Sequence, residues 1–357
     1  MRHTKTSYKL ISLALCLAML LPLAGCGESK QEQAEIFAMD TYMTLTAYGK
    51  NATAGLNAAK SVITSMDSML DPELETSTTY AINHAEGASV VVPGQVARML
   101  STAQTVYKQS GGALDLTIYP LIKRWGFVDG KYYVPTDEEI SSDLAKRCFD
   151  KLTLTSFPSS GTYMVQMPSG GELSFASVAK GCASDNAIEA MRQAGVESGI
   201  ISLGGNVQTL GLKPDGSKWT VAIQDPNNTS SYVGVINVGE TAVITSGSYQ
   251  RNFTAPDGTV YQHIIDPKTG RPADSDLTSV SIITHGAMGG QGTCADAYST
   301  ALYVMGEAGA VDFWRSHSTV FDMVLITEDG RVLYTPGLAD CFNEREGSGY
   351  VYQPLAA

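Results

Sequence analysis

Asp296 and Thr300 form the pair of residues whose spacing suggests chemistry most directly. They lie four residues apart in the segment Ala-Asp-Ala-Tyr-Ser-Thr at 295–300, so on a helix both side chains project from one face. A carboxylate and a hydroxyl in that arrangement suit a hard cation such as Mg²⁺, with phosphate oxygens completing its ligands. The alternative is that Asp296 caps the helix N-terminus and Thr300 is only buried. On the pair alone, this structural interpretation is favoured.

His263 is a second candidate for chemistry. It ends an apolar strand pattern and precedes the turn sequence Asp-Pro-Lys-Thr-Gly at 266–270. Such a turn is rigid, so the imidazole is expected at the mouth of a strand beside a fixed loop. A histidine placed there suits general-base catalysis, and a structural histidine in the core is the alternative.

Two glycine-containing segments do not match the dinucleotide-binding motif or the nucleophile motif of hydrolases. Gly204-Gly205-Asn206 follows a predicted strand and either lets a ligand approach the backbone closely or forms an ordinary hairpin. It is not a GxGxxG sequence that opens a helix, so it is no dinucleotide fingerprint. Thr-Ser-Gly-Ser at 245–248 is not GxSxG, so a nucleophile elbow is unsupported. The residues alone point to a phosphate-bearing ligand with Mg²⁺.

The composition is that of an acidic globular protein. The chain has 357 residues, of which 43% are hydrophobic and 17% charged, and its formal net charge is −12. The hydrophobic content can form a sizeable core, which excludes disorder as a global description. The negative charge argues against a nucleic-acid binder. The length fits one large domain or two closely packed ones.

The N-terminus is predicted to be an export signal spanning residues 1–25. A positively charged start precedes an apolar run at 10–24, which is shorter than the ~20 residues of a membrane-spanning helix. The run ends in Leu-Ala-Gly-Cys at 23–26, which resembles a bacterial lipobox with lipidation at Cys26. A plain signal peptide with an incidental cysteine is the alternative.

Lipidation predicts a globular protein anchored to the extracytoplasmic face of the cell membrane. Residues 26–34 would be the lipidated cysteine and a polar tether, and residues 35–357 the functional domain. Removal of 1–25 takes away three positive charges, so the net charge becomes −15 instead of −12. Because an acidic body is repelled by an anionic bilayer, the lipid must provide the anchoring.

Apolar periodicity predicts an α+β protein, because helices precede strands without a βαβ alternation. Helices are expected at 54–70, 94–109, 137–147, 177–194, 294–305 and 306–315. Strands are expected at 37–49, 151–156, 162–167, 200–203, 207–212, 218–224, 233–238, 241–245, 260–265, 278–284, 321–327 and 331–335. Thr136 and Glu139 form a capping-box pattern, and the Gly-rich segment 286–292 is expected to be a loop.

The four cysteines of the body are expected to be free thiols. Cys148, Cys182, Cys294 and Cys341 are too scattered for a CxxC metal site. Export permits disulfides, but a chain of this length does not need them. Disulfide pairing is the alternative.

Taken in order, the motifs resemble those of the ApbE family of FAD:protein FMN transferases. The matching segments are Met-Asp-Thr at 39–41, Gly-Ala-Leu-Asp at 112–115, Pro-Leu at 120–121, Trp-Gly-Phe at 125–127, Ala-Lys-Gly at 179–181 with Asp185, Leu-Gly-Gly-Asn at 203–206, Thr-Ser-Gly-Ser-Tyr at 245–249, His-Ile-Ile-Asp-Pro-Lys-Thr-Gly at 263–270 and Ala-Asp-Ala at 295–297. Their order and spacing make the match specific. The resemblance implies a two-lobed α+β fold with a β-rich core, flanking helices and FAD in the cleft between the lobes.

The resemblance also implies an activity and a set of site residues. FAD and Mg²⁺ would be bound, FMN joined through a phosphoester to a Thr or Ser of an acceptor protein, and AMP released. The implied FAD contacts are Met39, Ala113, Leu114, Asp115, Lys180, Ile265 and Ser174, which stands where the family commonly has Asp. The implied Mg²⁺ ligands are Asp296, Thr300 and Ser177, the last often through its backbone oxygen. His263 would assist proton transfer from the acceptor hydroxyl and, with Asp296, form the catalytic set.

The implied acceptors are subunits of sodium-pumping and related electron-transfer complexes, and flavoproteins outside the membrane. One alternative is an FAD pyrophosphatase, in which water replaces the acceptor and FMN and AMP are released. Another is a non-catalytic lipoprotein that binds flavin or delivers a solute to a transporter. The Asp296 and Thr300 pair counts against simple capture, because capture does not need a metal at the pyrophosphate.

Overall fold

The computed structural model describes residues 30–286 and 290–356. The predicted signal peptide and the lipidation site Cys26 lie outside the described residues. The first strand begins at Gln31, inside the segment predicted to be a tether. It forms one edge of the large sheet. Exposed and half-buried residues alternate along it, because successive side chains point to opposite faces and one face is exposed to water.

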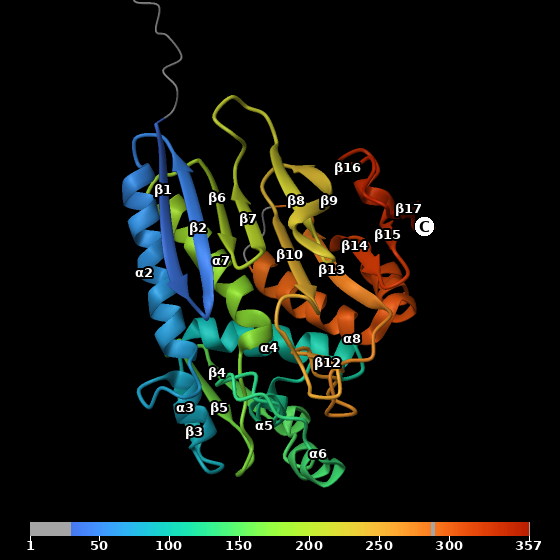
Figure 1. Cartoon of the computed structure of the whole chain (residues 1–357). Helices are drawn as coiled ribbons and strands as arrows, with labels where there is room; N and C mark the ends of the chain where they lie inside the picture. The colour runs from blue at the N-terminus through green and yellow to red at the C-terminus, as the bar shows by residue number, and fades with distance from the viewer. Residues whose placement is uncertain (1–29, 287–289, 357) are drawn as a thin grey trace, which may run out of the picture.

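A nine-stranded sheet forms the body, in the order β1-β2-β6-β7-β10-β13-β14-β15-β17 (Figure 1). Its strands are β1 (Gln31–Ala38), β2 (Thr41–Tyr48), β6 (Ser198–Leu203), β7 (Asn206–Leu210), β10 (Ala242–Gly247), β13 (Leu277–Thr284), β14 (Phe321–Thr327), β15 (Arg331–Tyr334) and β17 (Val351–Pro354). Neighbouring strands are antiparallel except β15 and β17, which are parallel. The antiparallel sheet confirms the predicted α+β class.

Both faces of this sheet are covered, which gives the body three layers. The helices α2 (Ala52–Leu70), α7 (Ala176–Gln193) and α8 (Gln291–His317) pack on one face. A small antiparallel sheet of β8 (Trp219–Asp225), β9 (Asn228–Val238) and β16 (Phe342–Glu344) covers part of the other. Successive residues therefore alternate between two cores: Ile282 and Met323 face the helices, and Ile283 and Val324 face the small sheet. Because layers cover the large sheet on both faces, every residue of β14 is buried.

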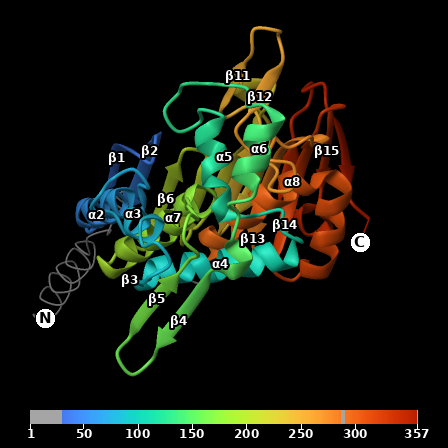
Figure 2. The same ribbon diagram turned by 90° about the horizontal axis from the view of Figure 1, so that it is seen from below.

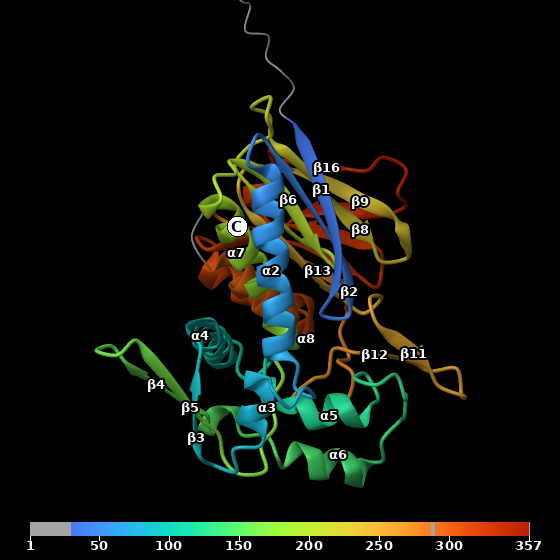
Figure 3. The same cartoon turned by 90° about the vertical axis from the view of Figure 1, so that its left-hand side faces the viewer.

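A second lobe lies below the body in Figures 1 and 3, and it faces the viewer in Figure 2, which is seen from below. It contains α3 (Thr78–Asn83), β3 (Ser89–Val92), α4 (Gly94–Gln109), η2 (Leu116–Ile118), α5 (Tyr119–Arg124), α6 (Asp137–Leu144), η3 (Phe149–Lys151), β4 (Thr153–Phe157) and β5 (Thr162–Gln166). The hairpin of β11 (Asn252–Thr254) and β12 (Val260–Gln262) projects beside it, and η4 (Pro336–Leu338) lies in the body. Trp125 joins the parts, since its indole N–H donates to the carbonyl of Gly270 at 2.9 Å. The expected two-lobed arrangement is confirmed.

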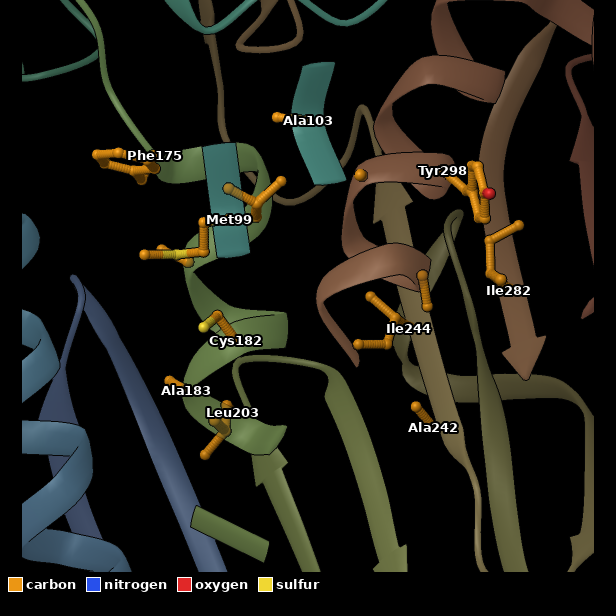
Figure 4. Packing of buried hydrophobic residues seen from close by; sticks show 14 of the residues in the cluster. Met99, Ala103, Phe175, Cys182, Ala183, Leu203, Ala242, Ile244, Ile282 and Tyr298 are labelled. Carbon is orange, nitrogen blue, oxygen red and sulfur yellow. The ribbon is translucent and has the colours of Figure 1, made fainter. Parts of the chain in front are cut away.

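Helix α4 seals the boundary between the lobes by packing against α7 and α8. Met99 of α4 and Cys182 of α7 lie in one core with Leu203, Ile244 and other residues of the large sheet (Figure 4). This contiguous apolar core packs the helices against the large sheet.

Most predicted elements are confirmed, and the differences have local causes. The single strand predicted at 37–49 is wrong, because β1 and β2 form a hairpin. Its turn residues Met39 and Asp40 both have positive φ, 49° and 57°, without a glycine that would signal the turn. The predicted division at 306 is confirmed, since Gly306 has φ 71° and interrupts α8. The capping box of Thr136 and Glu139 is also present.

Helix α8 begins at Gln291, inside the segment predicted to be a loop. Its start is stabilised from α7, because the carboxylate of Asp185 accepts hydrogen bonds from the backbone N–H groups of Gly292 and Thr293, both at 2.8 Å. Such a cap comes from a residue more than a hundred positions away, so local sequence cannot reveal it.

Two further properties concern the described part of the chain. All four cysteines of the body are free thiols, as expected. No described helix combines the length and the apolar character that a membrane crossing requires.

Two glycines, Gly181 and Gly292, lie where α7 and α8 cross. A Cβ at Gly181 would lie 2.1 Å from the carbonyl oxygen of Gly292 and 2.8 Å from the Cβ of Asp296. A Cβ at Gly292 would lie 2.6 Å from the carbonyl oxygen of Gly181. Because rigid backbone meets rigid backbone, any side chain here pushes the helices apart.

We expect Gly181→Ala to lower the free energy of unfolding by about 1–3 kcal/mol, measured by urea denaturation. Gly94→Ala is the matched control, because Gly94 also lies in a helix, α4, and its Cβ would lie 3.6 Å from the nearest side-chain atoms, those of Arg98 and Tyr163. In the control, the higher helix propensity of alanine should leave stability equal or raise it by up to about 1 kcal/mol. Equal effects of the two substitutions would contradict a tight crossing at Gly181.

Candidate active site

Asp296 is the buried carboxylate at the crossing of α7 and α8. Its side chain comes from α8 and is 3% exposed. Oδ2 accepts a hydrogen bond from the backbone N–H of Gly181 on α7 at 2.8 Å, and Oδ1 accepts one from Nδ2 of Asn206 at 3.0 Å. Burial raises the pKa of Asp296, and the nearby ammonium of Lys180 acts in the opposite direction. The carboxylate thus accepts from two neutral donors among the described residues.

One oxygen atom without a donor lies next to this carboxylate. Oδ1 of Asn206 is buried and has no hydrogen-bond partner among the described residues. A buried acceptor left unpaired costs about 1–3 kcal/mol, so an unsatisfied oxygen beside a buried carboxylate fits a cation. The described residues contain no cluster of three or more His, Cys, Asp or Glu able to hold a metal. A cation here would therefore be bound by one carboxylate together with neutral oxygens, which suits Mg²⁺.

The predicted metal ligands Thr300 and Ser177 lie on the same two helices. Thr300 is one turn beyond Asp296 on α8, and its hydroxyl lies 3.3 Å from that of Ser246, which in turn lies 2.8 Å from that of Ser299. Ser177 is one turn before Gly181 on α7, and in an α-helix its carbonyl is the i−4 acceptor of the same N–H of Gly181 that donates to Asp296. All three predicted ligands thus lie on α7 and α8 at or within one turn of the crossing.

Asp185 and Asn206 are site residues to which the sequence assigned no role. Asp185 also accepts from the hydroxyl of Thr293 at 2.7 Å and from Nε2 of Gln208 at 3.2 Å, and burial raises its pKa. Asp185 positions α8, and Asn206 positions Asp296. Both stood in quoted motifs, but their roles depend on partners 90 or more residues away.

His263 directly follows β12 and is partly buried. Its backbone N–H and its Nδ1 both lie 3.1 Å from the carbonyl oxygen of Arg251. Because a carbonyl can only accept, Nδ1 carries the proton and Nε2 keeps a lone pair. Burial lowers the pKa of His263 to about 4, helped by the positive charges of Lys180 and Arg251. The imidazole is therefore neutral near pH 7 and able to accept a proton.

The residues predicted to contact FAD border the junction of the two lobes. Met39 occupies the β1–β2 turn, where its N–H donates to Oδ1 of Asp67 at 2.9 Å. Ser174 precedes α7, and its hydroxyl accepts from the N–H of Ala176 at 3.3 Å. Ile265 lies in the apolar cluster of the second lobe.

The segment Ala113–Asp115 is buried next to these residues. Ala113 and Leu114 belong to the main core. Oδ1 of Asp115 accepts from the N–H and the hydroxyl of Thr117, both at 2.7 Å, and burial raises the pKa of this carboxyl group. The backbone N–H of Ser174 donates to the carbonyl of Leu116 at 3.1 Å, so this segment is tied to the start of α7.

A cavity of about 540 Å³ lies elsewhere, between the β11–β12 hairpin and the body. It is lined by polar residues, among them Tyr249, Gln262, Arg271, Ser275 and Glu328. None of the predicted site residues lines it. The chemistry-bearing groups are therefore at the α7–α8 crossing and beside His263, not in this cavity.

Comparisons with known proteins agree along the whole body of the chain. The model of the ApbE family matches residues 39–325. An FAD:protein FMN transferase of Vibrio cholerae serotype O1 is 30% identical over 329 residues, covering 88% of this chain and 94% of that protein. One of Treponema pallidum is 30% identical over 353 residues, covering 93% and 95%. The crystal structure of the ApbE protein of Thermotoga maritima superposes with a TM-score of 0.78 at 25% identity, covering 89% of this chain and 100% of that one.

We expect Mg²⁺ to raise the melting temperature of the wild-type protein and not that of Asp296→Asn. Binding to the folded state alone stabilises it by mass action, and the substitution removes the charged ligand while keeping the side-chain shape. Thermal unfolding with and without Mg²⁺ measures the difference.

Asp274→Asn is the matched control, because Asp274 is an exposed carboxylate at the separate cavity. The control should keep the Mg²⁺-dependent rise in full. A rise of equal size in Asp296→Asn would contradict a metal site at the helix crossing.

Proposed function

Because this chain belongs to the ApbE family, we propose that it is an FAD:protein FMN transferase. It moves FMN from FAD to the hydroxyl of a Thr or Ser in an acceptor protein. The bond formed is a phosphoester between the acceptor oxygen and the FMN phosphorus, and the bond broken is the pyrophosphate bond to AMP. The observation that carries the proposal is the buried carboxylate of Asp296 beside an amide oxygen that lacks a donor, together with a lysine, Lys180, that acts electrostatically on both Asp296 and His263.

His263 is the base in this proposal. Its Nδ1–H is held by the carbonyl of Arg251, which leaves the lone pair of Nε2 for the acceptor hydroxyl proton. In the free protein, the charges of Lys180 and Arg251 help to keep its pKa low. A bound pyrophosphate offsets these charges, so the basicity of His263 rises when substrate is present. His263 therefore becomes a stronger base in the complex with FAD, where the acceptor hydroxyl loses its proton.

The helix crossing provides the electrostatic part of the site. Asp296, Thr300 and the carbonyl of Ser177 would hold Mg²⁺, which when bound supplies positive charge that offsets the pyrophosphate and the AMP leaving group. Lys180 lies close enough to both Asp296 and His263 to lower the pKa of each. Its ammonium would face the phosphates. Met39, Ala113–Asp115, Ser174 and Ile265 at the lobe junction would contact the rest of FAD.

The proposed partners are FAD and flavoprotein subunits of electron-transfer systems outside the cytoplasm. A lipid on Cys26 would hold the enzyme on the extracytoplasmic face of the cell membrane, close to such acceptors. The lipobox-like sequence at 23–26 supports this location. Because an acidic body is repelled by an anionic bilayer, the lipid would provide the anchoring.

The activity is tested by incubating the protein with FAD, Mg²⁺ and the flavin-carrying subunit of a sodium-pumping complex. We expect the intact mass of the acceptor to increase by one FMN group, with one AMP released for each. EDTA should abolish the transfer, and added Mg²⁺ should restore it. Free FMN and AMP without a modified acceptor would indicate a pyrophosphatase, and intact FAD a flavin-binding protein.

In the same assay, His263→Ala should reduce transfer by about 10²–10⁴-fold, the usual cost of losing a general base. FAD affinity, measured by fluorescence quenching, should stay near that of the wild type. His84→Ala is the control, since His84 is exposed on α3's C-terminal side, and it should change neither quantity. A parallel loss of FAD binding and transfer would make His263 a structural residue.

Lipidation is tested separately by the intact mass of protein extracted from membranes. We expect a chain that begins at Cys26 and carries acyl groups, because one acyl chain alone gives only marginal membrane binding. Cys26→Ser should be recovered as soluble protein or uncleaved precursor, with an active domain. An unmodified N-terminus, or a start at another residue, would refute the lipoprotein proposal.

A further inference from the structure

Arg251 joins three segments of the chain around His263. It lies in the loop between β10 and β11. Its guanidinium donates to the carbonyl of Phe127 in the second lobe at 3.1 Å and lies 3.8 Å from the carboxylate of Asp40 in the β1–β2 turn. Its own carbonyl accepts from both the backbone N–H and Nδ1 of His263. Figure 3 shows the β11–β12 hairpin between the β1–β2 turn and α5.

These contacts connect the side chain of Arg251 to the geometry of the imidazole. The guanidinium contacts both lobes, through the hydrogen bond to Phe127 and the exposed ion pair with Asp40. These contacts orient the loop that carries the carbonyl of Arg251. Because the carbonyl of that same residue selects the tautomer of His263, a shift of the loop would move the acceptor of the Nδ1 proton. The ring centroid of Phe127 lies 6.4 Å from that of the imidazole. Arg251 therefore contacts both His263 and a residue that packs beside it.

We propose that Arg251 is a positioning residue for the transfer step, holding His263 so that Nε2 points at the acceptor hydroxyl. This inference rests on the proposed function, and it adds a residue that acts through the base. Arg251 combines a planar fork of donors with a permanent charge, and lysine can replace only the charge.

Electrostatics gives the proposal a second consequence. The charged groups that face His263 are Lys180 from α7 and Arg251 from its own loop, and the carboxylate of Asp40 faces Arg251. Both cations lower the pKa of His263. Loss of the charge of Arg251 therefore raises that pKa, and the acid limb of the transfer rate, which requires neutral His263, moves to higher pH.

The contacts of Arg251 contribute little to stability, which makes substitutions interpretable. Its side chain is 41% exposed and that of Asp40 is 74% exposed. Ion pairs as exposed as this contribute little to the free energy of unfolding. Variants of Arg251 are therefore expected to fold.

The test compares Arg251→Met and Arg251→Lys with the control Arg192→Met, all assayed for FMN transfer to the same acceptor subunit. Arg192 is similarly exposed and paired with Glu240, at the other end of α7. Arg251→Met should lose about 10- to 100-fold in transfer rate, the order expected for a misplaced reacting group, with FAD affinity within about threefold of the wild type. Its acid limb should move to higher pH. Arg251→Lys should lose rate with the acid limb unmoved, and Arg192→Met should change neither.

The decisive variant is the double substitution His263→Ala with Arg251→Met. If Arg251 acts through His263, the second substitution causes no further loss of transfer. Multiplicative losses, or a fall in FAD affinity that accounts for the rate, would overturn the positioning role. Either result, in an enzyme whose wild type transfers FMN, overturns the positioning role alone, whereas a wild type that modifies no acceptor overturns the proposed function itself.

Discussion

The close crossing of α7 and α8 is the constraint on which the site depends. The helices meet backbone to backbone because Gly181 and Gly292 lack side chains. This proximity lets Asp185 of α7 cap the start of α8, and lets Asp296 of α8 accept from the N–H of Gly181. Each helix thus positions the carboxylate of the other. With larger residues at the crossing, neither hydrogen bond could form, and the groups on the two helices would separate.

Burial determines the chemical character of the groups held there. The chain is acidic as a whole, but the groups around His263 are cationic, and its environment keeps the imidazole neutral. Asp296 is buried with neutral donors, and burial raises its pKa, so its charge is costly without a cation. Such a site binds an anionic phosphate and a divalent cation most tightly when both are present. The phosphate compensates the cations around His263, and the divalent cation compensates the carboxylate of Asp296.

The second lobe positions the segment that carries His263 and adds few reactive groups of its own. Its apolar cluster includes Ile265, two residues after His263, and Trp125 bonds to the turn at Gly270. Arg251 adds a polar link between this lobe and the β1–β2 turn. The segment carrying the base is thus held from both lobes. Precision in a transfer reaction requires such support, since a small displacement of a reacting group is costly.

The sequence alone determined the fold class, most helices and strands, and the pairing of Asp296 with Thr300, because apolar periodicity and i,i+4 spacing are local properties. It also determined the order of the motifs from which the activity was inferred. Only the tertiary structure decided the turn at Met39, the early start of α8, the roles of Asp185 and Asn206, and the tautomer of His263. The roles of Asp185 and Asn206, the start of α8 and the tautomer of His263 depend on partners distant in sequence. The turn at Met39 depends on positive φ angles at residues other than glycine. Neither kind of feature leaves a periodic pattern in the sequence.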